Sequence, residues 1–515
     1  MARRGDAMSS DNLLDLLEPV FARAAGDAAF EEPDGSLTTY GQLGARVNQF
    51  ANALVAADVK PGDRVTAQVE KSLANIFLYL ATLKIGAVFN PLNTAYTPAE
   101  LDYFVGDAMP AVLVAAPDRL EDLRAMAAQH GVAHVESMGA DGAGSLSGRA
   151  SEQPEVFETV ARERDDLACL LYTSGTTGRS KGAMITHGNL VSNAKTLHAH
   201  WQFEPGDVVL HALPTYHVHG LFVCLHTALL NGSRMLWLPR FDLDTVLAQL
   251  PRATVMMGVP TFYTRLLGDA RFTQDVVSGM RLFVAGSAPL LAETHAEFEA
   301  RTGYRILERY GMTEAGMITS NPYASEGRIA GTIGYALPDV SVRVADDDGA
   351  EIPCGEIGTL EVKGPNVFSG YWQMPEKTAE EFRADGYFIT GDLAQQDDDG
   401  RLAIVGRAKD LIISGGFNVY PKEIEVQIDE IDGVDESAVV GVPHPDFGEG
   451  VIAVVTAKGA GLTTDQVLEP LRNQLAKFKL PKKVFVVDAL PRNTMGKVQK
   501  AALRATYADT FAKGG

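Results

Sequence analysis

The sequence predicts an α/β protein with a large N-terminal domain, which holds parallel-type βαβ sheets and a β-rich subdomain, and a small C-terminal α/β domain. The chain has 515 residues, more than one ordinary domain needs. From residue 167 to about residue 308, short apolar runs alternate with amphipathic segments of helix length, which is typical of parallel βαβ units. After Thr332 the pattern changes to short strands and turns, and a final segment of roughly 100 residues is long enough to fold alone.

Residues 1–12 carry Arg3 and Arg4 but no apolar run follows, so we expect a flexible leader and no secretory signal, with Met8 as an alternative start. We expect an N-terminal domain over residues 13–407 and a C-terminal domain over residues 408–515. No run of about 18 apolar residues occurs, so we expect no membrane span.

The first third of the chain has a helix-rich pattern. Helices are expected at residues 40–57 and 72–85, where apolar residues recur at helical spacing. Residues 138–154 are rich in Gly, Ser and Ala, and we expect a surface loop there.

The central part predicts buried strands joined by helices. The expected strands lie at residues 167–171, 208–213, 254–259, 281–285 and 305–308. Helical patterns follow Gly188, Pro260 and Pro289, and Ser287 is expected to cap the last of these helices. Parallel strands collect function at their carboxyl ends, so the polar loops after these runs are candidate sites.

The last third predicts β structure and then a small α/β unit. Strand-like runs at residues 340–344 and 359–362 flank the acidic turn at residues 346–349, and residues 397–400 have the same composition. We interpret both turns as solvated, since a metal site would need further converging ligands. An amphipathic helix is expected to begin at Pro421.

Composition excludes some classes of function. The formal net charge of −21 argues against nonspecific binding to nucleic acid or to an anionic membrane, but local basic groups can still bind a small anionic ligand. Cys169, Cys224 and Cys354 are far apart and odd in number, so no disulfide framework or zinc spacing is expected. This low cysteine usage fits a reducing, cytoplasmic location.

A phosphate-binding loop is predicted at residues 172–182, which read Tyr-Thr-Ser-Gly-Thr-Thr-Gly-Arg-Ser-Lys-Gly. Glycines let backbone N–H groups turn toward phosphate oxygens, hydroxyls add donors, and the lysine supplies charge. The spacing is not that of a Walker A loop. A flexible linker is the alternative, but linkers rarely lie between apolar runs.

The order Ser-Gly-Thr-Thr-Gly-x-x-Lys-Gly resembles the ATP loop of adenylate-forming enzymes, the family of acyl-CoA synthetases, luciferases and peptide-synthetase adenylation domains. Five further motifs occur in the order of that family. They are Tyr-Gly-Met-Thr-Glu at residues 310–314, Thr-Gly-Asp at 390–392, Gly-Arg at 406–407, Ser-Gly-Gly at 414–416, and Pro-Arg-Asn-Thr-Met-Gly-Lys at 491–497. One departure is Ser180, where many family members have proline before the loop lysine.

The resemblance implies a role for each motif. ATP or AMP would be bound by Thr173, Ser174, Gly175, Thr176, Thr177, Gly178, Lys181, Ala288, Pro289, Glu308, Arg309, Tyr310, Gly311, Met312, Thr313, Asp392 and Arg407. Mg²⁺ would be held by Thr176 and Glu314, and the catalytic residues would be Lys497, Lys181, Thr176 and Glu314. Lys409 would be the hinge of a mobile C-terminal domain, and Ser414, Gly415 and Gly416 would line the CoA tunnel.

These roles suit the chemistry. A substrate carboxylate attacks the α-phosphorus of ATP, so negative charge accumulates and must be neutralised. Lys181 can bind the leaving pyrophosphate, while Lys497 can contact both the carboxylate and the α-phosphate. Without its motif, Lys497 would be interpreted as a solvated lysine of the basic tail. The resemblance also implies that a lysine acyltransferase and a deacylase act on Lys497.

The acyl pocket is expected in the loops after the central strands. His217 and His219 lie in one such loop, where a hydrogen bond to substrate is a simpler interpretation than a metal site. From the residues alone, Arg265 is either a solvated helix arginine or a clamp for a second carboxylate. Together with residues 286–289 and 308–314, the segment Phe-Tyr-Thr-Arg resembles the malonyl-CoA synthetase group, which implies that Arg265, Ser287 and His217 bind the distal carboxylate of malonate or methylmalonate.

Three alternatives stay open at this point. A short- or medium-chain monocarboxylate–CoA ligase would use the same motifs, with Arg265 structural. A carrier-protein-loading adenylation enzyme would pass the acyl group to a protein thiol. A nucleotide-binding protein without activity would not need both Lys181 and Lys497.

Overall fold

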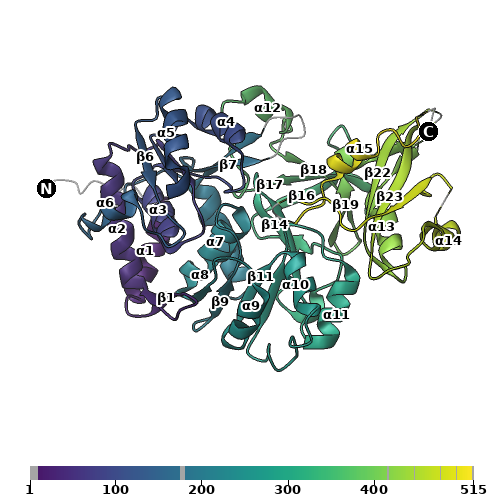
Figure 1. The fold of residues 1–515 in the computed structure, drawn as a ribbon, viewed down its shortest axis with the longest axis horizontal. Helices are drawn as coiled ribbons and strands as arrows, with labels where there is room; N and C mark the ends of the chain where they lie inside the picture. The colour runs from purple at the N-terminus through teal and green to yellow at the C-terminus, as the bar shows by residue number, and fades with distance from the viewer. Residues whose placement is uncertain are drawn as a thin grey trace.

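The computed structural model describes residues 10–173, 180–414, 417–445, 447–475, 477–493 and 496–512. Across these ranges the strands form four sheets. Figure 1 shows the N-terminal elements at one end of an elongated molecule and the C-terminal elements at the other.

The first sheet has the strand order β6-β5-β3-β4-β7-β8. Its strands are β3 (Arg64–Gln68), β4 (Val88–Pro91), β5 (Val112–Ala115), β6 (His134–Ser137), β7 (Leu167–Thr173) and β8 (Lys181–Thr186). The helices of this part of the chain are α1 (Leu13–Arg23), α2 (Tyr40–Ala56), α3 (Leu73–Lys84), α4 (Pro98–Ala108), α5 (Leu120–Gln129) and α6 (Ser145–Ser151). All neighbours pair in parallel except β8, which returns antiparallel to β7 and places Lys181 opposite Thr173.

The second sheet has the strand order β15-β14-β13-β12-β11-β9-β10-β1-β2 and is parallel from β13 to β1. Its strands are β1 (Ala28–Glu31), β2 (Leu37–Thr39), β9 (Val208–His211), β10 (Arg234–Trp237), β11 (Val255–Gly258), β12 (Leu282–Ala285), β13 (Leu307–Met312), β14 (Gly316–Ser320) and β15 (Tyr335–Ala336). Its helices are α7 (His187–His200), a π-helix (His219–Cys224), α8 (Leu225–Asn231), α9 (Leu243–Gln249), α10 (Pro260–Leu267) and α11 (Ala292–Thr302).

One apolar core joins these two sheets. It contains Phe89 of the first sheet and Val209 of the second, together with most of α3. Every residue of α3 is buried, which fits a helix that is apolar on all sides. Ser72 begins this helix, because its side chain accepts a hydrogen bond from the backbone N–H of Asn75.

The third sheet is antiparallel, with the order β16-β17-β18-β19. Its strands are β16 (Ser341–Ala345), β17 (Ile357–Lys363), β18 (Phe388–Gln396) and β19 (Leu402–Arg407), and α12 (Pro375–Glu380) precedes β18. The acidic turn after β16 is closed by Asp346, whose Oδ1 accepts the backbone N–H groups of Asp348 and Ala350 at 3.0 and 2.9 Å. This carboxylate therefore serves to close the turn.

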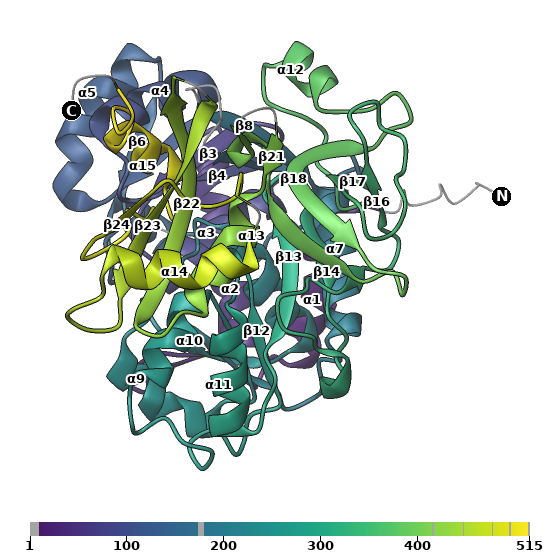
Figure 2. The same ribbon diagram turned by 90° about the vertical axis from the view of Figure 1, so that its right-hand side faces the viewer.

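The fourth sheet has the order β21-β20-β23-β22, with β24 beside β23. Its elements are β20 (Ile412–Ser414), β21 (Phe417–Val419), α13 (Pro421–Asp429), β22 (Val434–His444), β23 (Gly448–Ala457), α14 (Thr464–Gln474), β24 (Lys483–Val486) and α15 (Lys500–Thr506). Its apolar clusters are separate from those of the N-terminal sheets. Figure 2 shows this unit nearest the viewer, with β3, β4 and β6 of the first sheet behind it and the third sheet at its side, and an ion pair from Lys458 Nζ to Glu293 Oε1 of 2.8 Å joins it to α11.

The predicted fold class is confirmed by this architecture, and the expected strands correspond to β7, β9, β11, β12 and β13. Two local expectations were wrong. Ser287 does not cap a helix, because it has a left-handed backbone (φ 71°) and α11 begins only at Ala292. The expected loop at residues 138–154 contains α6, which buries Leu146 and Ala150, one helical turn apart. No helix in the described ranges is long and apolar enough to cross a lipid bilayer.

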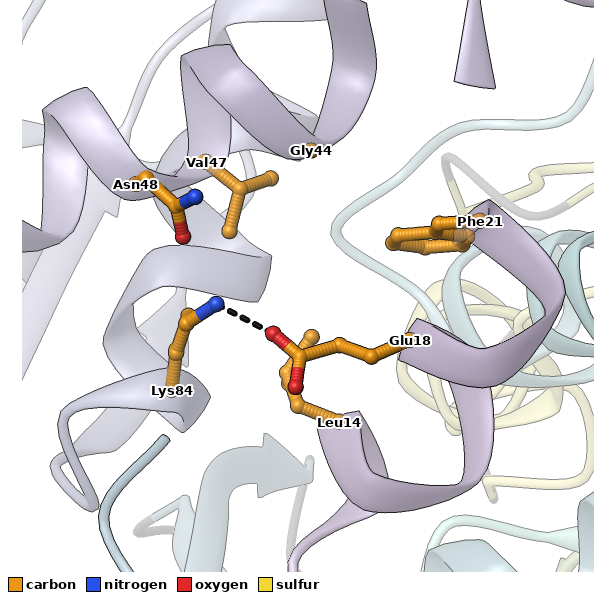
Figure 3. Close-up of a pocket in the computed structure, with 7 residues that line it drawn as sticks. All are labelled: Leu14, Glu18, Phe21, Gly44, Val47, Asn48 and Lys84. Carbon is orange, nitrogen blue, oxygen red and sulfur yellow. Dashed lines mark hydrogen bonds and ion pairs between the residues drawn. The ribbon is translucent and has the colours of Figure 1, made fainter. Parts of the chain in front are cut away.

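A cavity of about 160 Å³ lies between α1, α2 and α3 (Figure 3). The buried Lys84 forms an ion pair there with Glu18. Glu18 Oε2 also accepts a hydrogen bond of 3.0 Å from the Thr159 hydroxyl. The pair thus ties α1 to α3 and to the segment that leads into β7.

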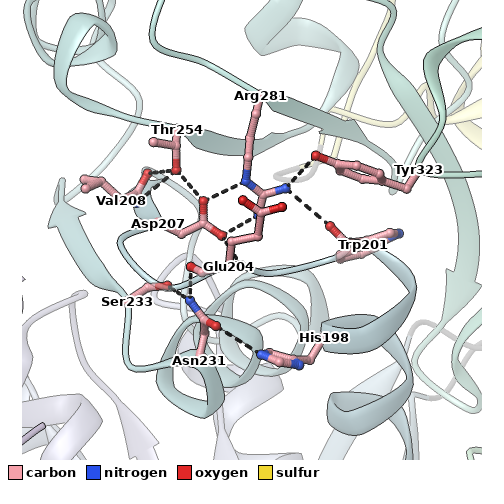
Figure 4. A network of polar contacts seen from close by, with 10 residues as sticks. All are labelled: His198, Trp201, Glu204, Asp207, Val208, Asn231, Ser233, Thr254, Arg281 and Tyr323. Carbon is pink, nitrogen blue, oxygen red and sulfur yellow. Dashed lines mark hydrogen bonds and ion pairs between the residues drawn. The ribbon is translucent and has the colours of Figure 1, made fainter.

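A buried polar network holds the amino ends of β9, β11 and β12 together (Figure 4). Arg281 Nε donates to Asp207 Oδ1 at 2.7 Å, and the same oxygen accepts from the Thr254 hydroxyl at 2.8 Å. Arg281 also donates to the carbonyl oxygen of Trp201 and to the Tyr323 hydroxyl. The opposite ends of these strands carry the polar loops, so the network fixes the frame of the candidate site.

We expect Arg281→Met to lower the free energy of unfolding by about 3–5 kcal/mol, because it leaves Asp207 buried without its cation. Arg124→Met removes an exposed pair with Glu121 and should cost less than about 1 kcal/mol. Urea unfolding followed by tryptophan fluorescence compares the two variants, and Trp201 lies beside Arg281 as a reporter. Equal loss in both variants would contradict this account of the network.

Candidate active site

Lys181 begins β8 and is buried, with 9% of its surface exposed. Its Nζ lies 2.8 Å from Glu381 Oε1 and 4.0 Å from the centre of the Tyr371 ring. The loop that precedes it holds the predicted ligands Ser174, Gly175, Thr176, Thr177 and Gly178, which lie outside the described residues. The structure therefore shows a lysine fixed at the loop's end by a carboxylate and a ring.

Glu314 lies next to this lysine in the turn between β13 and β14. Its Oε1 accepts hydrogen bonds from the Thr173 hydroxyl at 3.2 Å and from the Tyr371 hydroxyl at 3.3 Å. Burial raises the pKa of Glu314, while Thr173 and Lys181 oppose that rise. A carboxylate and a hydroxyl are oxygen donors that suit Mg²⁺, an ion often held by one or two carboxylates and substrate phosphates.

Asp392 lies on β18 directly opposite Arg407 on β19. Only 2% of its surface is exposed, and its Oδ1 lies 2.6 Å from Arg407 Nε. The Tyr310 hydroxyl donates to the other carboxylate oxygen. Burial raises the pKa of Asp392, and Arg407 opposes that rise. We call these three residues the ribose-binding group, after the role that the motifs predict for Asp392 and Arg407.

A second cluster, formed by His217, His219, Ser287 and Arg309, lies in loops and strand ends of the second sheet. Ser287 Oγ lies 3.2 Å from His219 Nδ1, and His217 Nδ1 accepts the backbone N–H of His219 at 3.3 Å. Burial, with the nearby charges of Lys497 and Arg309, lowers the pKa of His217 to about 3. Burial and Arg309 also lower the pKa of His219. We call these four residues the acyl cluster.

Arg309 is the charged member of the acyl cluster. It is 4% exposed, and its guanidinium covers the backbone of Gly286, where an added Cβ would lie 2.3 Å from the arginine Cζ. Burial lowers its pKa to about 10, so it is protonated at neutral pH. The resemblance placed Arg309 among the ATP ligands, whereas the structure places it beside the two histidines.

Arg265 lies in the second turn of α10, which begins at Pro260 as predicted. Its side chain is exposed, and its Cζ lies 5.9 Å from the centre of the Phe241 ring. Phe241 in turn stacks on Phe262. Arg265, the predicted carboxylate clamp, therefore lies on α10 near the stacked rings of Phe241 and Phe262.

Lys497 lies in the C-terminal part of the chain, between β24 and α15. Its backbone N–H donates to Asn493 Oδ1 at 3.0 Å, and the preceding Gly496 (φ 74°) approaches Thr261 on α10. Its side chain is exposed, yet the surrounding protein and Arg407 lower its pKa, against the opposing charges of Asp392 and Glu314. Lys497 therefore lies between the ribose-binding group and the acyl cluster.

The remaining predicted residues take the following places. Ala288 and Pro289 follow Ser287, Gly311 and Met312 end β13, and Thr313 begins the turn to Glu314. Glu308 is buried, lies 3.3 Å from His295 and accepts the backbone N–H of Gly331. Lys409 lies in a single 3₁₀ turn after β19, and the buried Ser414 ends β20. Gly415 and Gly416 lie outside the described residues.

Sequence reasoning missed Tyr371 and Glu381. The Tyr371 hydroxyl donates to Glu381 Oε2 at 2.7 Å and thereby links the partner of Lys181 to Glu314. Glu381 follows α12 in an acidic stretch that has the composition of a solvated helix face. An unpaired buried lysine is costly, which is the one signal that could have prompted a search for its partner.

Comparison with known proteins supplies the family. Residues 18–372 match the AMP-binding enzyme family, and residues 423–497 match the AMP-binding enzyme C-terminal domain. The chain belongs to the AMP-binding enzyme family. The members of this family share the mixed α/β fold described above, so the fold and the family agree.

Three relatives show the breadth of the AMP-binding enzyme family around this chain. The ATP-bound crystal structure of MatB from Rhodopseudomonas palustris is 56% identical, with a TM-score of 0.94 and coverage of 98% of this chain and 100% of that one. The mitochondrial malonate–CoA ligase of Mus musculus is 35% identical, over 94% of this chain and 90% of the relative. The feruloyl-CoA synthase of an Amycolatopsis species is 37% identical, over 94% and 97%. The chain is accordingly an adenylate-forming acid–thiol ligase that uses ATP and CoA.

We expect Asp392→Asn to weaken ATP binding about tenfold or more, because it removes the charge that strengthens hydrogen bonds from ribose hydroxyls. Asp398→Asn makes the same change in the exposed acidic turn after β18 and should leave ATP affinity unchanged. Isothermal titration with ATP measures both. Equal ATP affinity of the two variants would argue against a ribose contact at Asp392.

Proposed function

We propose that this ligase is an ATP-dependent malonyl-CoA synthetase, with methylmalonate as a second substrate. The observation that carries the proposal is the acyl cluster, which holds a buried cation and neutral hydrogen-bonding groups where the acyl chain is expected. A monocarboxylate would leave such a cation without a partner, whereas a dicarboxylate supplies one. The relationship to the mouse malonate–CoA ligase supports the same substrate.

In the first half-reaction, a carboxylate oxygen of malonate attacks the α-phosphorus of ATP, and the bond to pyrophosphate breaks. Lys497 is placed to hold the attacking carboxylate and the α-phosphate, between Asp392 and the acyl cluster. Lys181 leaves its ion pair with Glu381 and binds the pyrophosphate oxygens instead. Glu314 would hold Mg²⁺, which when bound neutralises phosphate charge.

In the second half-reaction, the CoA thiolate attacks the acyl carbonyl, and AMP leaves with the electrons of the broken acyl–phosphate bond. The C-terminal domain would turn about Lys409 so that Lys497 withdraws and Ser414 approaches the thiol. Lys409 lies in a single turn between β19 and β20, where a change of a few backbone angles suffices for such a rotation. These domain and hinge assignments are part of the proposal.

A monocarboxylate–CoA ligase is the second candidate. The feruloyl-CoA synthase relative favours it, because ferulate carries one carboxylate and an aromatic ring. The exposed position of Arg265 beside Phe241 is also consistent with it. The two candidates differ in the acid that is turned over.

Turnover of a panel of carboxylic acids distinguishes a malonyl-CoA synthetase from a monocarboxylate–CoA ligase. We expect CoA-dependent AMP formation to be fastest with malonate or methylmalonate among acetate, butyrate, ferulate, succinate and these two acids. Arg265→Ala should lower kcat/KM for malonate by about tenfold or more if its guanidinium contacts the distal carboxylate. If the wild type preferred ferulate or butyrate, the proposed substrate would be a monocarboxylate and not malonate. If Arg265→Ala turned over malonate as well as the wild type does, only the role of Arg265 as a carboxylate clamp would be contradicted.

Lys497→Ala tests whether Lys497 acts in adenylation but not in thioester formation. We expect ATP–pyrophosphate exchange to fall about 100–1000-fold, because a charge that stabilises the transition state is lost. Thioester formation from supplied acyl-adenylate should persist. Lys483→Ala, an exposed lysine of β24, is the matched control. Equal loss of both half-reactions would contradict the role of Lys497.

A further inference from the structure

Lys71 connects the first two sheets at the carboxyl ends of their strands. It lies between β3 and α3, and its Nζ donates to the carbonyl oxygens of His211 at 2.9 Å and Leu238 at 2.6 Å. The same nitrogen lies 2.9 Å from His211 Nδ1 and 4.1 Å from the centre of the Trp237 ring. His211 ends β9 and Trp237 ends β10, so Lys71 reaches from the first sheet to two strand ends of the second.

The three acceptors around Lys71 match an ammonium group. An ammonium has three N–H donors, whereas a neutral amine has two and would leave one acceptor without a donor. Burial lowers the pKa of Lys71, and the three acceptors favour its charged form. Lys84 and Lys181 pair with carboxylates, but Lys71 donates to uncharged groups. Its contacts therefore fix the position of the ammonium without cancelling its charge.

His211 is fully buried, and its two neighbours require one tautomer of its ring. The ammonium of Lys71 only donates, so His211 Nδ1 accepts. His211 Nε2 lies 3.0 Å from the carbonyl oxygen of Gly220, which only accepts, so Nε2 carries the proton. Burial and the charge of Lys71 lower the pKa of His211, in agreement with a neutral ring. The imidazole thus connects Lys71 to the backbone of Gly220.

Gly220 closes the loop that carries both histidines of the acyl cluster. Its backbone N–H donates to the carbonyl oxygen of His217 at 3.1 Å. A Cβ added at Gly220 would lie 2.0 Å from the carbonyl oxygen of Pro214, so the two ends of the loop are in close contact. His219 directly precedes Gly220 and lies 3.2 Å from the Ser287 hydroxyl. A shift of Gly220 would therefore move His217 and His219.

We propose that Lys71 and His211 are positioning residues for the acyl side of the site. Lys71 holds His211 in the tautomer that donates to Gly220, and this contact holds the loop that carries His217 and His219. The inference rests on the proposed placement of the acyl chain at the acyl cluster. Small displacements of groups that position a substrate can lower the rate about 100-fold, so a contact outside the site can affect turnover.

Substitution of His211 tests this role. His211→Leu removes the donor toward Gly220, whereas His211→Gln keeps an N–H that can donate there and an oxygen that can accept from Lys71. We expect His211→Leu to raise KM for the preferred acid of the wild type and to lower kcat/KM about 10–100-fold. ATP affinity, measured by isothermal titration, should stay unchanged. His211→Gln should recover most of the lost kcat/KM.

A double-mutant cycle tests whether Lys71 acts through His211. Lys71→Met removes the donor to the ring, and it gives the same KM comparison if His211→Leu does not fold. Because the two residues belong to one chain of contacts, Lys71→Met combined with His211→Leu should lose about as much kcat/KM as His211→Leu alone. Losses that multiply would overturn the proposed connection.

His226→Leu is the matched control. His226 is also buried, and its Nε2 lies 2.8 Å from the hydroxyl of Tyr79, a residue of the apolar core. This variant should lower resistance to urea and leave KM for the acid unchanged. An unchanged KM in His211→Leu would overturn the inference. Equal effects of the two leucine variants, or weaker ATP binding without recovery in His211→Gln, would overturn it in favour of a general role in stability.

The comparison is independent of the identity of the acid. A wild type that prefers a monocarboxylate would contradict the proposed substrate, whereas KM is compared for whichever acid the wild type prefers. Failure of the inference and failure of the proposed function are therefore distinguishable.

Discussion

The pairing of β18 with β19 is the constraint on which the rest of the site depends. It places Asp392 opposite Arg407, and the ion pair between the buried Asp392 and the partly exposed Arg407 fixes both the ribose-binding group and the point where the chain leaves the third sheet. Lys409, the proposed hinge, follows Arg407 by two residues. Tyr310 extends the same contact to β13, and β13 carries Arg309 on its other face. One strand register thus positions the groups that face the nucleotide and those that face the acyl chain.

The two buried cations of the site, Lys181 and Arg309, differ in the partners that the protein gives them. Lys181 has Glu381 as its partner in this structure, and Glu381 is also bound by Tyr371 and Lys377. When phosphate takes the lysine, Glu381 therefore keeps two other contacts, which lowers the cost of the exchange. Arg309 has no such substitute. The two buried cations consequently differ: Lys181 has a carboxylate partner within the protein, whereas Nε and Nη2 of Arg309 have none among the described residues.

Much of this organisation could be predicted from the sequence, because short apolar runs and turn residues report directly on strands and their ends. The strands β9, β11 and β12 are examples, whereas Asp392 and Arg407 were indicated by their resemblance to family motifs. Side-chain direction could not be predicted in the same way. The left-handed backbone of Ser287 decides which way that side chain points, and it has no composition signal. Glu381 was missed because its neighbours in sequence are acidic and its partner lies 200 residues away.

The ion pair between Lys458 and Glu293 has a consequence for the timing of turnover. Its side chains are 47% and 61% exposed, so it contributes about 0–1 kcal/mol to the docked arrangement. An attachment of that size is comparable to thermal energy, and water and salt ions compete with it. This ion pair therefore adds little to the stability of the present orientation of the C-terminal unit. In the proposed two-step reaction, such a weak contact would be broken at little cost when the C-terminal domain turns.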